Sequence, residues 1–151
     1  MMTPLQTQLG NVVRALVLVL VGCGGDGDDE DDAGFDCDIT AVYMGTYRIT
    51  LVETSGDCGP AGPPQVVTVP SPGDPNCIVE SASVSADQCT ISVQGVCELE
   101  DEYGPYSIRQ SEALTQQDEH GDLLLGTGET TVFDADGVIC HNTFSIRSER
   151  I

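Results

Sequence analysis

Apolar and polar residues alternate with a period of two along most of the chain after residue 35. The clearest stretch is 43–52, whose two faces carry Tyr47, Ile49 and Leu51 on one side and Thr46, Arg48 and Thr50 on the other. Shorter stretches with this period cover 77–84, 89–99, 106–110, 122–127, 130–133 and 138–146. A period of two is typical of half-buried strands, and no stretch after residue 35 has a convincing helical period. The pattern predicts an all-β fold, an antiparallel meander of six to eight strands forming a small barrel or sandwich.

Turn residues separate these strands. Six of the eight prolines lie between Gly56 and Asn76, around the short apolar piece Val66–Val69, which predicts a long loop with at most one edge strand. Near the end of the chain, Asp134-Ala135-Asp136-Gly137 separates two alternating runs. Aspartate opens such turns and glycine takes the left-handed position, so a hairpin is predicted here.

Two registers compete for the hairpin formed by 77–84 and 89–99. A three-residue loop, Ala86–Gln88, places Cys77 opposite Cys97 and permits a disulfide, whereas a two-residue loop, Asp87-Gln88, pairs the apolar residues better. Cys89 and Cys97 cannot bond each other on a straight strand, because about 26 Å separates them at 3.3 Å per residue. The connectivity of the cysteines stays open.

An apolar run, Ala15–Val21, stands near the amino terminus and ends in Leu20-Val21-Gly22-Cys23. The run is shorter than the roughly 20 residues that span a bilayer. Arg14 precedes it and small residues follow, as in a signal peptide. Leu-Val-Gly-Cys resembles the lipobox of bacterial lipoproteins.

The resemblance implies that residues 1–22 are a signal peptide, cut between Gly22 and Cys23, and that Cys23 becomes an acylated amino terminus. More than one acyl chain makes a stable membrane anchor. Within that family, aspartate after the cysteine retains the protein at the inner membrane, and this chain has Gly24. The membrane is the implied partner, and the expected location is the outer membrane of a bacterial cell envelope.

An acidic segment separates Cys23 from the β pattern. Residues 26–32 contain six acidic side chains in seven positions, and the tether 23–35 is predicted to be extended and solvated. Carboxylates attract divalent cations weakly, but the pattern of an EF-hand fails because Asp31 stands where its glycine belongs. The β domain is therefore expected to occupy residues 36–151.

The chain has seven cysteines, an odd number. If Cys23 carries lipid, an even set remains, which predicts up to three disulfides in an oxidising compartment. The candidates are Cys37, Cys58, Cys77, Cys89, Cys97 and Cys140. A zinc site is the alternative, but the chain has no Cys-x-x-Cys pair and only two histidines, so no metal ligand is assigned.

The charge excludes one class of partner. The formal net charge is −20, with five basic residues and no lysine. Nucleic acid requires basic side chains, so nucleic-acid binding is excluded.

Candidate catalytic groups are few. His120 lies in the polar stretch Asp118–Asp122, which is predicted to be a turn. His141 lies on the outward face of the last predicted strand. Cys140 and His141 point to opposite faces, and no Gly-x-Ser-x-Gly motif or phosphate-binding glycine loop is present. Glu100-Asp101-Glu102 precedes a second turn. We assign no catalytic residue and no cofactor.

Gly45-Thr46-Tyr47, with Arg147 or Arg150 near the end, resembles the Gly-x-Trp and late arginine of lipocalins, although tryptophan is absent. Three functions therefore remain. The first is an anchored lipoprotein whose β domain has a non-catalytic structural or binding role. The second is a lipocalin-like binder of a small apolar ligand, and the third is a hydrolase or inhibitor acting in the envelope.

Overall fold

The computed structural model describes residues 34–70 and 73–151 of the chain. Seven antiparallel strands form one sheet, which confirms the predicted all-β fold. The strands are β1 (Gly45–Gly56), β2 (Gln65–Val69), β3 (Cys77–Val84), β4 (Thr90–Asp101), β5 (Gly104–Gln116), β6 (Leu123–Asp134) and β7 (Gly137–Arg150). One helical turn, α2 (Ile39–Val42), precedes them.

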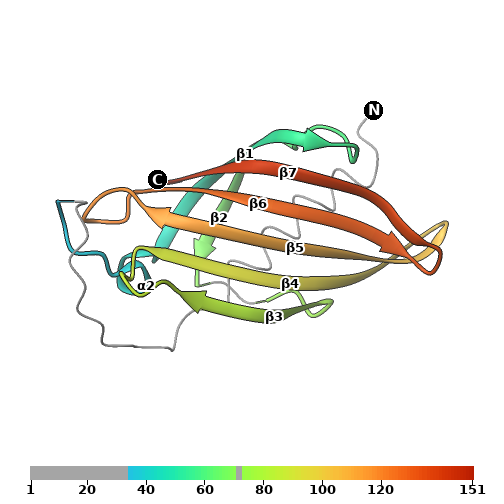
Figure 1. Ribbon diagram of the computed structural model, residues 1–151, viewed down its shortest axis with the longest axis horizontal. Helices are drawn as coiled ribbons and strands as arrows, with labels where there is room; N and C mark the ends of the chain where they lie inside the picture. The colour runs from blue at the N-terminus through green and yellow to red at the C-terminus, as the bar shows by residue number, and fades with distance from the viewer. Residues whose placement is uncertain (1–33, 71–72) are drawn as a thin grey trace.

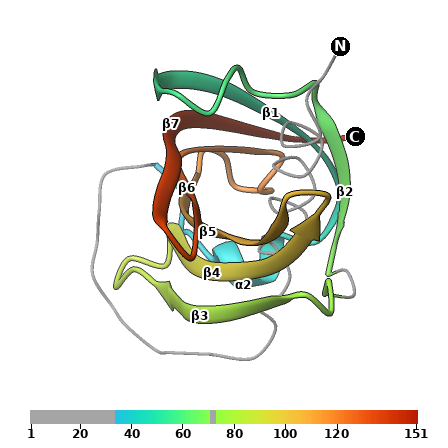
Figure 2. The ribbon, with the colours of Figure 1, turned by 90° about the vertical axis from the view of Figure 1, so that its right-hand side faces the viewer.

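The strand order is β2-β1-β7-β6-β5-β4-β3. Strands β3 to β7 form an antiparallel meander of five strands, and the β1–β2 hairpin is added where β1 pairs with β7, which gives seven strands in all. Consecutive strands are thus neighbours throughout except for β2 and β3, which are the two edges of the sheet. The sheet curls so far that these edges turn toward each other, and Figure 2 shows the resulting half-barrel from its end.

Two glycines of β6 lie in close contact with neighbouring groups. A Cβ atom at Gly126 would lie 1.8 Å from the backbone oxygen of Ala113, and one at Gly128 would lie 2.5 Å from the Phe144 ring. Neither position has room for a side chain. The ring of Phe144 instead takes the space over Gly128 on the inner face of the sheet.

The register of the β3–β4 hairpin combines both predicted alternatives. Near the turn, Val84 faces Ile91 and Ala82 faces Val93, as the two-residue loop predicts. A β-bulge between Val79 and Ser81 then shifts the pairing by one residue, so that Cys77 faces Cys97 at the far end. One extra residue in β3 therefore permits both the apolar match and the disulfide.

The turn of this hairpin does not use glycine. Gln88 takes a left-handed conformation with φ 58°. The Asp87 carboxylate accepts hydrogen bonds from the Ser85 hydroxyl and from the backbone N–H of Cys89. These bonds hold the pKa of the Asp87 carboxyl below its usual value and fix the turn locally.

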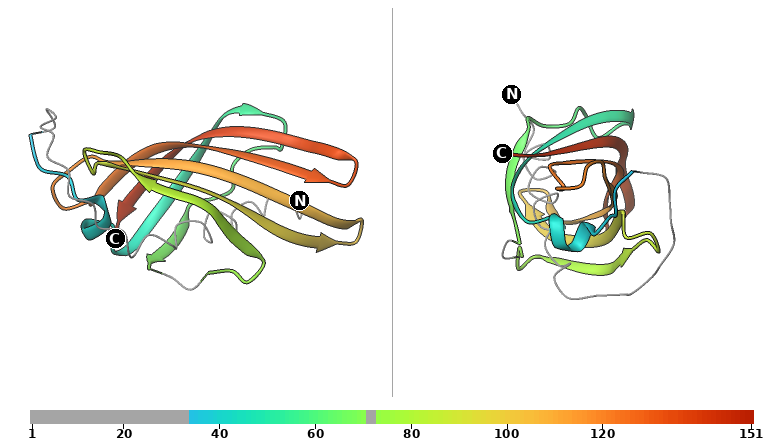
Figure 3. Two further views of the ribbon diagram at one scale, coloured as in Figure 1. Left: turned by 60° about the horizontal axis from the view of Figure 1, so that its bottom comes forward. Right: turned by 90° about the vertical axis from the view of Figure 1, so that its left-hand side faces the viewer.

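The ends of the half-barrel differ. The β4–β5 and β6–β7 hairpins extend at one end, and α2 lies at the other (Figure 1). The helical turn was not predicted; its sequence signal is Asp38, whose carboxylate caps the turn by accepting from the N–H of Ala41 at 3.2 Å. Figure 3 shows α2 across the opening of the curled sheet.

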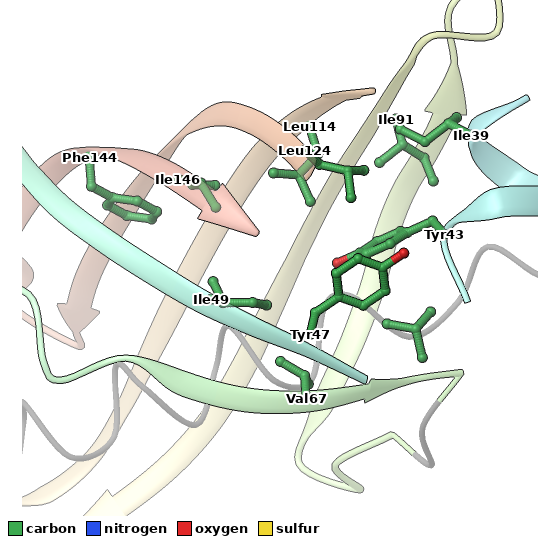
Figure 4. Close-up of a cluster of buried hydrophobic side chains, with 11 residues drawn as sticks. Ile39, Tyr43, Tyr47, Ile49, Val67, Ile91, Leu114, Leu124, Phe144 and Ile146 are labelled. Carbon is green, nitrogen blue, oxygen red and sulfur yellow. The ribbon is translucent and has the colours of Figure 1, made fainter. Parts of the chain in front are cut away.

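The interior contains two hydrophobic clusters. The first lies near α2, and most of its members appear in Figure 4: Ile39, Tyr43, Tyr47, Ile49, Val67, Val69, Ile91, Leu114, Leu124, Phe144 and Ile146. The second comprises Cys58, Val93, Cys97, Tyr106, Ile108, Val132 and Cys140. Polar side chains of β5, β6 and β7 are buried as well, and they are described below.

Strand β5 is longer than its sequence predicts. The alternation predicts a strand over 106–110, whereas β5 runs from Gly104 to Gln116. Its even-numbered residues all face inward, but Gln110, Glu112 and Gln116 are polar. Polar residues at inward positions interrupt the alternation of apolar and polar residues, so the sequence pattern predicts too short a strand.

Candidate functional site

All six predicted disulfide cysteines are paired. The bonds join Cys37 to Cys89, Cys58 to Cys140 and Cys77 to Cys97. The first ties the segment before α2 to the β3–β4 turn, the second ties the loop after β1 to β7, and the third crosses between β3 and β4. Cys89 and Cys97 have different partners, as the strand geometry predicts.

Asn142 supports the second disulfide from β7. Its side-chain oxygen accepts a hydrogen bond of 2.8 Å from the backbone N–H of Cys58, and its amide nitrogen donates to the backbone oxygen of Gly59 at 2.8 Å. Asn142 is itself buried. The loop after β1 is thereby fastened to β7 by one covalent bond and two hydrogen bonds.

The predicted lipidation and cleavage residues, Cys23 and Gly22, lie outside the described residues, as do residues 23–33 of the predicted tether and its acidic positions. Among the residues that the structure describes, no helix is both long and apolar enough to cross a membrane.

Tyr47 and Arg150 meet at the end of the half-barrel that carries α2. The Cζ atom of Arg150 lies 5.1 Å from the centroid of the Tyr47 ring. The Tyr47 hydroxyl donates a hydrogen bond of 2.8 Å to the backbone oxygen of Gly121. Tyr47 and Arg150, two residues of the pattern that resembles lipocalins, are thus in contact, whereas Arg147 pairs with Glu149 on β7.

The Arg150 guanidinium binds four further groups. It forms an ion pair with Asp122 at 2.7 Å and donates to the backbone oxygens of Val42 at 2.7 Å and His120 at 2.9 Å, and also to that of Met44. These acceptors come from α2, from the residue that precedes β1 and from the β5–β6 turn. Arg150 therefore holds three parts of the chain together at this end.

His120 lies in the β5–β6 turn, as predicted, and is exposed. The carboxylate of Asp118 organises the turn by accepting from the backbone N–H groups of His120, Asp122 and Leu123 at 2.8–3.0 Å. Partial burial opposes ionisation, yet these donors hold the pKa of Asp118 below its usual value. The arrangement is that of a capped turn.

His141 is exposed on the outer face of β7, also as predicted. Its Nδ1 lies 2.8 Å from the Thr131 hydroxyl on the neighbouring strand, and its backbone N–H donates to the Asp57 carboxylate at 2.8 Å. Within the described chain, no serine or carboxylate is hydrogen-bonded to either imidazole ring.

A buried carboxyl group lies between the two hydrophobic clusters. Glu112 is 6% exposed on the inner face of β5, opposite Val93 of β4 and Gly128 of β6. Its side-chain oxygen accepts from the amide nitrogen of Gln110 at 3.4 Å. Burial raises the pKa of Glu112 to about 7, and the bond from Gln110 offsets this only in part.

Three buried polar atoms of the described interior have no hydrogen-bond partner: the Tyr43 hydroxyl, the Ser148 hydroxyl and the side-chain oxygen of Gln110. Burial first, and then the charge of Glu112, raise the pKa of the Tyr43 hydroxyl, while the neighbouring Ser148 hydroxyl lowers it. Buried polar atoms ordinarily have partners. The hydrophobic pattern did not predict these buried polar groups, although Gln110 and Glu112 share the inward parity of Ile108 on the same strand.

The outer face of the sheet carries a shallow groove of about 400 Å³. It crosses β3 to β7 between two rows of small polar side chains, among them Ser81, Ser92, Ser111, Thr127 and Thr143. The groove has hydroxyl groups and one amide from Gln94, with Glu129 as its charged side chain on this face. No nucleophile there is paired with a base.

Within residues 34–70 and 73–151, no group of three or more His, Cys, Asp or Glu side chains is arranged to hold a metal ion. Neither a family model, nor a curated protein, nor a solved structure matches this chain.

Proposed function

We propose that this protein is an exported lipoprotein, anchored to the bacterial outer membrane through Cys23, whose β domain has a non-catalytic structural or binding role. The anchor rests on the motif Leu20-Val21-Gly22-Cys23 and on the apolar run before it.

The pairing of the cysteines supports this proposal most strongly. Six of the seven form disulfides with one another inside the β domain, which leaves Cys23 for another chemistry. Three disulfides also fit an oxidising compartment outside the cytoplasm. The first described bond begins at Cys37, close to the end of the proposed tether.

The non-catalytic role rests on the surroundings of the two histidines. Catalysis by histidine requires a substrate-binding cleft and a partner within hydrogen-bond reach of the ring. His120 lies in a capped turn, and His141 contacts only the Thr131 hydroxyl through its ring. Neither lines the groove on the outer face.

The test is metabolic labelling with a fatty acid of cells that export the wild type or Cys23→Ser. The labelled cells are then separated into membrane and soluble fractions. We expect the wild type in the membrane fraction with label and the variant without label and at full precursor length. Gly25→Ser is the matched control, because it lies beyond the motif and should fractionate like the wild type. Equal membrane retention and labelling of Cys23→Ser would exclude the proposed anchor.

A lipocalin-like binding role is the second candidate, and the stacking of Arg150 on Tyr47 favours it. The pairing of the first described strand with the last is also the arrangement of an up-and-down barrel. Buried side chains of the first hydrophobic cluster occupy the interior near α2, however. Titration with a fluorescent fatty acid tests this role: saturable binding that Phe144→Trp weakens supports an interior site, and absence of binding excludes it.

A further inference from the structure

We propose that the interior of the half-barrel binds a small organic ammonium group between the two hydrophobic clusters, with the Glu112 carboxylate and the side-chain oxygen of Gln110 as its acceptors. This site goes beyond the proposed function, because membrane anchoring neither requires nor supplies it.

The acceptors lie side by side on β5. The amide nitrogen of Gln110 donates to Glu112 at 3.4 Å, and the amide oxygen of Gln110, a second acceptor, has no partner among the described residues. Gln110 is fully buried and faces Gly95 of β4, which contributes no side chain there. A donor group placed at this point would satisfy both side chains.

The number of acceptors matches an ammonium group. The two carboxylate oxygens of Glu112 and the side-chain oxygen of Gln110 are three acceptors on neighbouring inward positions of β5. An ammonium group has three N–H donors. The Tyr43 and Ser148 hydroxyls lie further toward α2, since Ser148 faces Leu124 in the row of Gln116, and they are not part of the acceptor set.

No described side chain supplies a cation to Glu112. The chain has no lysine. Its described arginines are engaged elsewhere: Arg109 pairs with Glu80 at 3.4 Å, Arg147 pairs with Glu149 at 2.8 Å, Arg150 binds Asp122, and Arg48 is exposed opposite Glu149. A buried carboxylate without a counter-charge is costly, and an external cation removes that cost.

The charge of the whole chain favours a cationic ligand. The formal net charge is −20, so the potential around the protein concentrates cations and repels anions. An anionic or neutral ligand would leave the Glu112 carboxylate uncompensated. The surrounding apolar side chains, Val93 and Phe144 among them, exclude water and favour an alkyl group beside the ammonium.

The test is calorimetric titration of the full-length protein in detergent with n-butylammonium chloride at pH 8 and constant ionic strength. We expect saturable binding that Glu112→Gln weakens about tenfold or more, the effect of losing a charge-assisted hydrogen bond. Glu129→Gln is the matched control, because it removes the same charge from the outer face of β6 and should leave the affinity within about twofold.

Proton release provides a second readout. At pH 6 the ammonium group should displace the proton of Glu112, so that binding releases up to one proton in buffers of different ionisation enthalpy, and at pH 9 it should release none. Equal affinity of wild type and Glu112→Gln, an equal loss in Glu129→Gln, or absence of binding would overturn the proposal. Equal binding of n-butanol would also overturn it.

Discussion

The guanidinium of Arg150 lies over the ring of Tyr47, 5.1 Å from the ring centroid, and joins the last residue of β7 to the beginning of β1. Gly45 lies beside this contact at φ +110°, a conformation that favours glycine, and a Cβ atom there would lie 3.0 Å from the guanidinium. The contact fixes α2, the β5–β6 turn and both strands relative to one another.

Removal of this contact should destabilise the domain. Tyr47→Phe removes the hydroxyl that donates to Gly121 at 2.8 Å and should cost about 1–2 kcal/mol. Arg150→Ala removes an ion pair and several bonds to backbone oxygens and should cost about 2–3 kcal/mol. Urea unfolding of the two variants and of the double variant measures the coupling between them, for which we expect about 0.5–1 kcal/mol. Strict additivity would show that the stacking contributes nothing.

Stability should fall as pH rises through the range in which Glu112 titrates. In the unfolded chain this carboxyl has a pKa near 4.5, and in the folded protein the pKa is about 7. Below pH 4.5 both states hold the proton, so there is no effect. Between pH 4.5 and 7 the unfolded state loses its proton first, and above pH 7 the folded state carries a constant penalty of about 3 kcal/mol.

Glu112→Gln should abolish this penalty, since glutamine has the same shape and no charge. We expect the variant to match the wild type at pH 4.5 and to be more stable at pH 8, by urea unfolding at both values. Glu129→Gln on the outer face serves as the control and should show no such pH-dependent gain. A Glu112→Gln variant that is less stable than the wild type at pH 8 would mean that the buried carboxylate is already compensated.

The two glycines of β6 should respond differently to alanine. At Gly128 the added methyl group meets the Phe144 ring, so Gly128→Ala should cost about 1–3 kcal/mol and Phe144→Leu should restore part of the loss. At Gly126 the methyl group meets the backbone of Ala113, which no side-chain change relieves. Thermal unfolding of each variant with and without Phe144→Leu checks this. Equal rescue at both positions would contradict the geometry.

The disulfides should contribute according to the chain length that each one closes. Cys58 and Cys140 are separated by 82 residues, and Cys77 and Cys97 by 20. The loop-closure model predicts losses of about 4.5 and 3.3 kcal/mol when the paired cysteines are replaced by alanine. Chemical unfolding of the two double variants tests the order. A larger loss for the shorter loop would indicate that native contacts, rather than chain entropy, dominate.

Sorting of the anchored protein should depend on the residue after Cys23. If the outer membrane is the destination, Gly24→Asp should shift the protein to the inner membrane, as the lipoprotein resemblance implies, and Gly24→Ser should not. Sucrose-gradient separation of the two membranes measures the distribution. An unchanged distribution for Gly24→Asp would remove the argument for the outer membrane while leaving the anchor intact.

The sequence predicted the strands whose inward residues are apolar, such as β1 with Tyr47, Ile49 and Leu51. It predicted the β6–β7 hairpin as well, where Asp134 accepts from the N–H of Asp136 within the turn. Alternation and turn residues are local signals, so a single sequence carries them.

Contacts between residues far apart in the chain could not be predicted from the sequence alone. Whether β1 pairs with β7, and which cysteines meet, depends on how the sheet curls, and no local signal encodes that. The bulge in β3 is another example, because it reconciles two registers that appear exclusive in the sequence. The buried Glu112 was overlooked because a polar residue in an alternating strand is ordinarily assigned to the solvent side.

The most direct test of the proposed anchor is the intact mass of the mature protein extracted from membranes with detergent. We predict a chain that begins at Cys23, carries the mass of a diacylglyceryl group and an N-acyl chain, and lacks two hydrogens for each of its three disulfides. A chain that retains residues 1–22, or one that begins elsewhere with an unmodified Cys23 thiol, would contradict the account.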